Sequence, residues 1–143
     1  METQQYRLFH DIYVFLDAGD SRALEGFHLT PSQFSLLMLL DPFEGHNLIR
    51  LAERLLVARS TITRLIDQLE LLGIVHRVSD PNDRRAQQVR LTEKGSLIRE
   101  RALIAHERSL NQRFGVLSIH EQETLVRLLK RLRDGLIDDV DKA

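Results

Sequence analysis

The chain has 143 residues, of which 43% are hydrophobic and 29% charged, and a formal net charge of −1. This composition predicts one globular domain, or one small domain with an extension, and excludes a disordered chain. The chain has no cysteine, which excludes disulfides, thiolate zinc sites and cysteine redox sensing. No apolar run approaches the roughly 20 residues of a membrane span. Because the amino-terminal stretch METQQYRLFHDIYVFL also lacks a basic leader and a cleavage site, we expect a cytoplasmic protein.

Basic residues are concentrated in the middle of the chain. The whole chain carries 20 basic and 21 acidic side chains, and residues 46–95 carry nine and six of these. The remaining residues therefore carry 11 basic and 15 acidic side chains, so the middle of the chain is basic and the remainder is acidic. Local clustering decides whether a surface binds phosphate, so a net charge near zero does not exclude a nucleic-acid partner.

The first predicted helix presents an aromatic and apolar stripe. Its members recur at helical spacing: Tyr6, Phe9, Tyr13 and Leu16. Gly19, Asp20 and Ser21 predict an interruption after this stripe. In the next stretch, LTPSQFSLLMLL, Thr30 and Gln33 form the pattern of a capping box, which predicts a second helix that ends at Asp41-Pro42.

Two shorter helices are predicted in the basic region. The first has apolar residues at 48, 51, 52 and 55 and a capping residue, Asn47. The second has an apolar stripe from Ile62 to Leu72 and ends at Gly73. Its outer face is polar and consists of Arg59, Ser60, Thr61, Thr63, Arg64 and Gln68.

A short antiparallel hairpin follows these helices. IVHRV and QQVRL alternate in polarity and flank the loop SDPNDRRA, and Thr92 caps a further helix from residue 93 to about 113. Two short helices joined by a tight turn and followed by a hairpin form a winged helix-turn-helix. In that fold the second helix enters the major groove of DNA, and an arginine of the wing can enter the narrow minor groove. Ordinary solvated surface is the alternative for these polar residues.

The last predicted helix begins with a second capping box at Ser118 and Glu121. Its apolar stripe includes Leu125, Leu128 and Leu132. This stripe and the aromatic stripe of the first helix either pack on each other within one chain or form an interface between two chains. The basic run at positions 127, 130, 131 and 133 is read as the solvated face of this helix.

The sequence offers little for a metal site or an enzyme. The histidines at positions 10, 28, 46, 76, 106 and 120 form no i, i+4 pair and no closed ligand set, so neither a metal nor a cofactor is expected. No nucleophile elbow, glycine-rich phosphate loop or acid pair is recognisable. A winged helix used for protein contact instead of DNA binding is the main alternative function.

The stretch LAERLLVARSTITRLIDQLELLGIVHRVSDPNDRRAQQVRLTEKG resembles the DNA-binding core of the MarR (multiple antibiotic resistance regulator) family. The family's wing pattern is matched by Asp83, Arg85, Leu91, Thr92 and Gly95. LTPSQFSLLMLL is similar to the family's second helix and LSIHEQETLVRLLKRL to its last, so the resemblance extends from about Tyr6 to Leu136.

The resemblance implies a role for each residue of the wing. Arg85 is expected in the minor groove, Asp83 is expected to orient it, and Arg84 is expected on a phosphate. The chain departs from the family pattern at Leu56, where glycine is usual, and at Ala58, where serine or another capping residue is common. A missing N-cap costs about 1 kcal/mol, so the recognition helix is expected to begin later, with Ser60 as its cap.

The resemblance also implies an assembly and an architecture. We expect a mainly α fold with a two-stranded β-hairpin wing, in which residues 30–95 form the winged helix-turn-helix and residues 1–29 and 96–143 form the dimerisation region of one compact chain. The expected function is that of a homodimeric transcriptional regulator, acting as a repressor, which binds a pseudo-palindromic site in double-stranded DNA. A small aromatic or phenolic effector is a further expected partner.

Overall fold

The structure is a computed structural model that describes residues 1–142, apart from the side chain of Arg84. In chain order its elements are α1 (Thr3–Leu24), η1 (Glu25–Phe27), α2 (Pro31–Leu37), β1 (His46–Asn47), α3 (Leu48–Leu55), α4 (Arg59–Leu71), β2 (Val75–Asp80), β3 (Asp83–Leu91), α5 (Glu93–Phe114) and α6 (Ile119–Asp141). The chain divides into two compact units, Met1–Glu107 and a second that begins at Arg108. No helix among the described residues is long and apolar enough to cross a membrane.

The predicted helix caps are confirmed by their hydrogen bonds. Thr30 Oγ1 accepts from the Gln33 N–H at 3.2 Å, and Gln33 Oε1 accepts from the Thr30 N–H at 3.0 Å. Asn47 Oδ1 accepts from the N–H of Ile49 at 2.8 Å, at the start of α3. Ser118 and Glu121 form the same reciprocal pair at the start of α6. These bonds satisfy N–H groups that the first turn of a helix leaves without partners, which is why they could be read from the sequence.

Three predicted helix boundaries are wrong. Helix α1 runs through residues 19–21 to Leu24, where a buried leucine and a hydrogen bond between Asp20 and His106 (3.0 Å) hold its last turns. Helix α2 ends at Leu37, before Asp41-Pro42. Helix α4 begins at Arg59 with Ala58 as N-cap, so Ser60 is not the cap. At α1, the tertiary contact outweighs the local propensity.

The core of the first unit is built around α4. Its inner face is fully or almost fully buried and consists of Ile62, Leu65, Ile66 and Leu69. These side chains join one apolar cluster with buried residues of α1, α2, α3, β2, β3 and α5. Gly73, with φ +71°, ends α4 in the left-handed conformation that glycine adopts without strain, as the sequence predicted. The packing of the inner face in the core therefore fixes the orientation of the outer face of α4.

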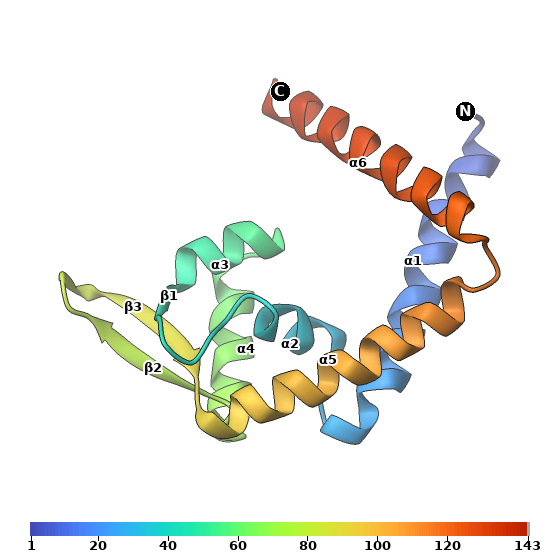
Figure 1. Cartoon of the computed structure of the whole chain (residues 1–143). Coiled ribbons are helices and arrows are strands. Elements are labelled where there is room, and N and C mark those ends of the chain that lie inside the picture. The colour runs from blue at the N-terminus through green and yellow to red at the C-terminus, as the bar shows by residue number, and fades with distance from the viewer. Residues whose placement is uncertain (143) are drawn as a thin grey trace. The chain divides into compact units, whose positions relative to one another are not determined.

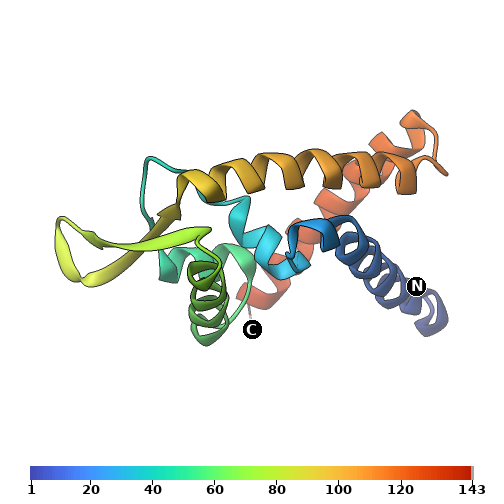
Figure 2. The ribbon, with the colours of Figure 1, turned by 90° about the horizontal axis from the view of Figure 1, so that it is seen from below.

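The hairpin of β2 and β3 extends beyond the helices of the first unit as a two-stranded arm (Figures 1 and 2). The two-residue strand β1 pairs with β3, which gives a three-stranded antiparallel sheet in the order β1-β3-β2 instead of the two strands predicted. The register is regular from Val75↔Leu91 to Ser79↔Gln87 and then breaks, because the next pair is Asp80↔Asp83. Residues 84–86 are therefore extra residues on β3 and form a bulge near the tip.

The corner between β3 and α5 is closely packed around Gly95. Thr92 Oγ1 accepts from the Gly95 N–H at 2.9 Å, which confirms Thr92 as the predicted cap. A Cβ added at Gly95 would lie 1.9 Å from the backbone oxygen of Ile74. Only glycine allows the two backbones to approach this closely.

The apolar stripes of the first and last helices are largely exposed in the single chain. On α1, the exposed fraction is 66% for Tyr6 and 69% for Tyr13; on α6 it is 47% for Leu128 and 43% for Leu132. The predicted division at residues 30 and 95 differs from the observed units, because the carboxyl end of α1 and the first part of α5 pack with the winged helix. The buried residues Leu24 and Ala102 carry these contacts.

The turn between α3 and α4 contains a strained residue. Leu56 has φ 56° and ψ 42°, in the left-handed region that costs a non-glycine residue about 1–2 kcal/mol. Its side chain is 91% exposed, so little packing compensates for the cost. The chain therefore has leucine in place of the family's usual glycine at a position whose backbone conformation favours glycine.

Replacing Leu56 with glycine should stabilise the protein by about 1 kcal/mol, because the strain is removed and almost no buried surface is lost. Urea unfolding followed by circular dichroism measures the change. Leu56→Ala is the matched control: it removes the same exposed side chain but keeps Cβ, so it should gain much less. Equal stabilisation by both variants would assign the effect to the exposed leucine rather than to the backbone.

Candidate nucleic-acid interface

The outer face of α4 carries most of the predicted contact residues. Arg59, Ser60, Thr63 and Arg64 are exposed, and Thr61 is half-buried. Thr63 Oγ1 donates to the backbone oxygen of Arg59 at 3.1 Å, which leaves the hydroxyl oxygen free to accept. Because Ala58 provides no capping oxygen, the first turn of α4 also presents backbone N–H groups without a side-chain cap. This end of the helix can therefore donate to a phosphate or to a base edge.

The helix and the wing share one surface cleft of about 290 Å³. It is lined by Asn47, Leu48, Ile49, Arg59, Thr63, Arg85, Ala86 and Gln87. Two arginines from segments 26 positions apart, Arg59 and Arg85, thus face the same space as the Thr63 hydroxyl. The arrangement can bind an anionic polymer by charge and hydrogen bonds.

Gln68 is placed differently from the other predicted residues of α4. It is half-buried, and its Oε1 accepts a hydrogen bond from Nε2 of Gln33 at 3.0 Å. Gln33 is itself buried and belongs to the α2 capping box. Gln68 therefore fastens α4 to α2, and its predicted contact with DNA has no support from this geometry.

The wing tip is shaped by two aspartates that bind backbone groups. Asp80 Oδ1 accepts from the Asn82 N–H at 2.8 Å, and Asp83 Oδ1 accepts from the Arg85 N–H at 2.9 Å. Asp83 thus holds the backbone of Arg85, whereas the sequence suggested that it orients the side chain. The predicted phosphate contact of Arg84 concerns a side chain outside the described residues.

A wing residue that the sequence did not single out, Arg77, joins β2 to α4. Its Nη1 donates to Glu70 Oε1 at 2.6 Å, and its Nη2 forms a short bond with Asp67 Oδ1. The hydrogen bond with Asp67 is the main reason that the pKa of Arg77 is raised above its ordinary value. Contacts between elements far apart in the sequence follow no short sequence period. Neither this contact between β2 and α4 nor that of Gln33 on α2 with Gln68 on α4 could therefore be predicted from the sequence.

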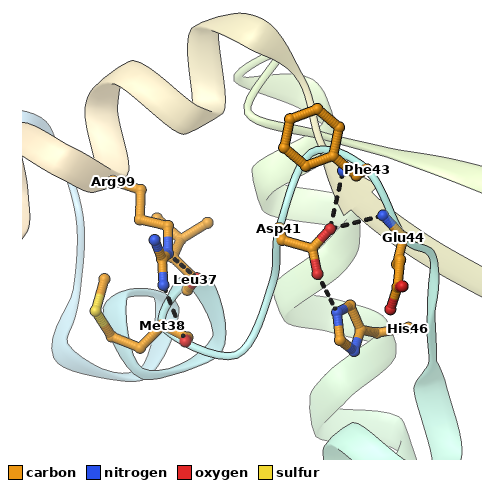
Figure 3. Close-up of polar contacts among 7 residues, drawn as sticks. All are labelled: Leu37, Met38, Asp41, Phe43, Glu44, His46 and Arg99. Carbon is orange, nitrogen blue, oxygen red and sulfur yellow. Dashed lines mark hydrogen bonds and ion pairs between the residues drawn. The ribbon is translucent and has the colours of Figure 1, made fainter.

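The loop before α3 is fixed by Asp41 (Figure 3). Its Oδ1 accepts from the N–H groups of Phe43 (2.8 Å) and Glu44 (2.6 Å), and its Oδ2 lies 3.0 Å from His46 Nε2. The bond from Glu44 is the largest of the contributions that lower the pKa of Asp41 from 3.8. The carboxylate therefore stabilises the loop at pH values above its ordinary pKa, and this contribution is lost as the pH falls through the lowered pKa.

Arg99 of α5 fixes the other end of the same segment (Figure 3). Its Nε donates to the backbone oxygen of Leu37 at 2.8 Å and its Nη2 to that of Met38 at 3.2 Å. These bonds give side-chain donors to two carbonyls at the end of α2, and that of Leu37 also accepts from the Leu40 N–H at 3.2 Å. Together with Asp41, Arg99 sets the path of the chain from α2 to the start of α3.

Within the described part of the chain, no group of three or more histidine, aspartate or glutamate side chains could hold a metal ion. The charged side chains that line the cleft, Arg59 and Arg85, are both cationic, so the cleft favours anions over cations.

Comparison with known proteins agrees with this geometry. Residues 29–86 match the model of the MarR family. The chain is 30% identical to the uncharacterised HTH-type transcriptional regulator YkoM of Bacillus subtilis, over 88% of this chain and 82% of that one.

Solved structures of DNA complexes share the fold. A mutant of MarR from E. coli in complex with operator DNA has a TM-score of 0.84 and 27% identity, covering 91% of this chain and 94% of that one. The transcriptional repressor CouR bound to a 23-mer DNA duplex has a TM-score of 0.83 and 27% identity, covering 88% and 89%. The predicted winged helix-turn-helix is confirmed, and the homologues are regulators rather than enzymes. The chain belongs to the MarR family and is a DNA-binding transcriptional regulator.

Proposed function

We propose that the protein is a homodimeric repressor that binds a pseudo-palindromic operator, with α4 in the major groove and the wing in the adjacent minor groove. The observation that carries this proposal is the cleft in which Arg59 and Thr63 of α4 meet Arg85 of the wing. One rigid unit can therefore touch both grooves. The DNA complexes of MarR and CouR, which share this fold, support DNA binding and weigh against a winged helix used only for protein contact.

Within this proposal the residues on the outer face of α4 form two groups, one that contacts bases and one that contacts phosphates. Thr63 and Arg64 lie one turn into the helix and contact base edges, where arginine pairs with guanine and threonine with several bases. Arg59, Ser60 and Thr61 lie in the first turn and bind phosphate, together with the uncapped N–H groups beside Ala58. Gln68 is left out of the contact set because it is bonded to Gln33.

In the wing, Arg85 enters the minor groove and Arg84 binds the backbone. Arg85 is exposed, and its backbone is held by Asp83. A narrow minor groove concentrates negative potential, which favours an arginine there. Asp83 acts indirectly, because it fixes the point from which the arginine side chain extends.

The dimer in this proposal is formed by the first and last helices. The apolar surface that an interface between two chains requires is provided by the aromatic stripe of α1 and the leucine stripe of α6. Leu16 and Leu125 are half-buried and the other members are exposed: Tyr6, Phe9, Tyr13, Leu128 and Leu132. A two-fold dimer presents its recognition helices about 34 Å apart, which matches one turn of DNA. A small aromatic or phenolic effector releases the operator; the family resemblance alone supports this part.

Selection of bound fragments from genomic DNA should yield one preferred, pseudo-palindromic site. On that site, Thr63→Ala and Arg64→Ala should each weaken binding by about 1–3 kcal/mol, because a base contact is lost. Electrophoretic mobility shifts or fluorescence anisotropy measure the change, with a random duplex as the control. Equal losses on both duplexes would assign these residues to phosphate binding.

Arg85→Ala should weaken binding more on sites flanked by A·T-rich steps than on G·C-rich ones, because the minor groove is narrower there. Asp83→Ala should show the same flank dependence at smaller size, since it releases only the backbone of Arg85. Titrations on both flank types give the comparison. A loss that is independent of the flank would place Arg85 outside the minor groove.

Light scattering should give about twice the chain mass of 16.6 kDa at micromolar concentration. Leu128→Glu should shift the protein towards monomer, because a carboxylate in the interface loses its hydration. Lys130→Glu, on the same helix outside the leucine stripe, is the control and should leave the dimer intact. A wild-type monomer would rule out both the interface and the palindrome argument.

A further inference from the structure

The helix proposed to enter the major groove carries two carboxylates on its outer face. Asp67 and Glu70 follow Arg59 and Thr63 at spacings of four, four and three residues, which places all four on one side of α4. The side chains of Asp67 and Glu70 are 58% and 42% exposed. Two free negative charges on this face would repel the phosphates on either side of the groove.

Both carboxylates are occupied by a single arginine from the neighbouring strand. Arg77 of β2 places one guanidinium nitrogen on Asp67 and another on Glu70, and its backbone N–H is 3.3 Å from the second oxygen of Glu70. Its side chain is only 24% exposed. The guanidinium is therefore turned towards α4, with its charge committed to the two acids, rather than extended into solvent as a phosphate contact would require.

We propose that Arg77 serves DNA binding through Asp67 and Glu70: it neutralises much of their charge and so allows the recognition helix to approach the phosphates. Arg77 is a positioning residue, since it acts through the two carboxylates and does not itself touch DNA. This inference rests on the proposed DNA contact of the outer face of α4. The charge of a contacting ion pair is felt much less at a distance than that of a lone carboxylate, because the two fields largely cancel.

A mechanical role for the same contacts makes a different prediction. If Arg77 only braces the wing against α4, its removal damages binding however the carboxylates are charged. If Arg77 neutralises, then removing the carboxylate charges should restore binding without it. Replacing the carboxylates at positions 67 and 70 with neutral amides in a chain without Arg77, and measuring DNA binding, therefore distinguishes the two roles.

The experiment compares variants of the full-length chain on its selected site and on a random duplex, across a salt series. Arg77→Met keeps the apolar stem and should weaken binding to both duplexes by roughly threefold to tenfold at low salt, with a smaller loss at high salt. Arg90→Met is the matched control: it removes an arginine from the same sheet that is bonded to His76 rather than to α4, and it should cost much less.

The deciding variant combines Arg77→Met with Asp67→Asn and Glu70→Gln. It should regain wild-type affinity to within about twofold at low salt, by the same charge argument. A charge-matched variant, Arg77→Met with Glu53→Gln and Glu100→Gln, changes two exposed acids elsewhere and should not recover. Urea unfolding of each variant identifies losses that come from reduced stability.

Three outcomes would overturn the inference. The first is that the triple variant remains as weak as Arg77→Met, which indicates a brace. The second is that the charge-matched variant recovers equally, which indicates an effect of net charge. The third is a strong loss from Asp67→Asn with Arg77 intact, which indicates that Asp67 contacts a base. Failure of the wild-type chain to bind any DNA would instead refute the proposed function, so the two failures are distinguishable.

Discussion

The burial of one face of α4 is the constraint on which the rest of the first unit depends. Ile62 and Ile66 have no exposed surface, and the same short helix carries Arg59, Thr63 and Arg64 on its other face. A helix buried on one side cannot rotate without exposing leucine and isoleucine, at a cost of about 1.5–3 kcal/mol for each side chain. The direction in which the polar residues point is therefore set by the core, and the sequence of the core matters to recognition as much as the polar face does.

Polar bonds to α4, and to the neighbouring helix α2, add to this constraint. Gln33 of α2 holds Gln68, and Arg77 of the wing holds Asp67 and Glu70. On the side of α2, Arg99 of α5 holds the last carbonyls of that helix. A hydrogen bond contributes about 0.5–1.5 kcal/mol net between neutral groups and about 1.5–3 kcal/mol where one group is charged. The polar bonds thus reinforce the orientation of the helix that the core sets.

The features that could be predicted from the sequence are those coded within one short stretch of the chain. The capping pairs of Thr30 and Ser118 and the stop at Gly73 are local, and the wing pattern from Asp83 to Gly95 is compact enough to identify the family. Features that depend on distant residues were missed. Helix α1 passes through three poor helix formers because Asp20 meets His106, 86 positions away, and no local pattern carries that information.

The same limit explains the errors at the site. Gln68 has the spacing of an outer-face residue, but a partner on another helix turns it inward. The third strand, β1, is two residues long and too short to show any alternation. Asp83 was predicted to orient the side chain of Arg85, and it accepts from the backbone N–H of that residue instead. Local sequence thus predicted the elements of the proposed interface, and tertiary contacts determine which of their side chains are exposed.

The bulge at the wing tip has a consequence for how such a regulator can change over evolutionary time. The pairing of Ser79 with Gln87 fixes the sheet on one side of the break, and that of Asp80 with Asp83 fixes the turn on the other. In a regular hairpin, one inserted residue would flip every following side chain and expose Val89, which is buried in the core. Here the extra residues of the bulge accommodate an inserted or deleted residue without shifting the register of the sheet. Insertions and deletions at the tip can therefore lengthen or shorten the reach of the arginines while the sheet that carries them stays in register.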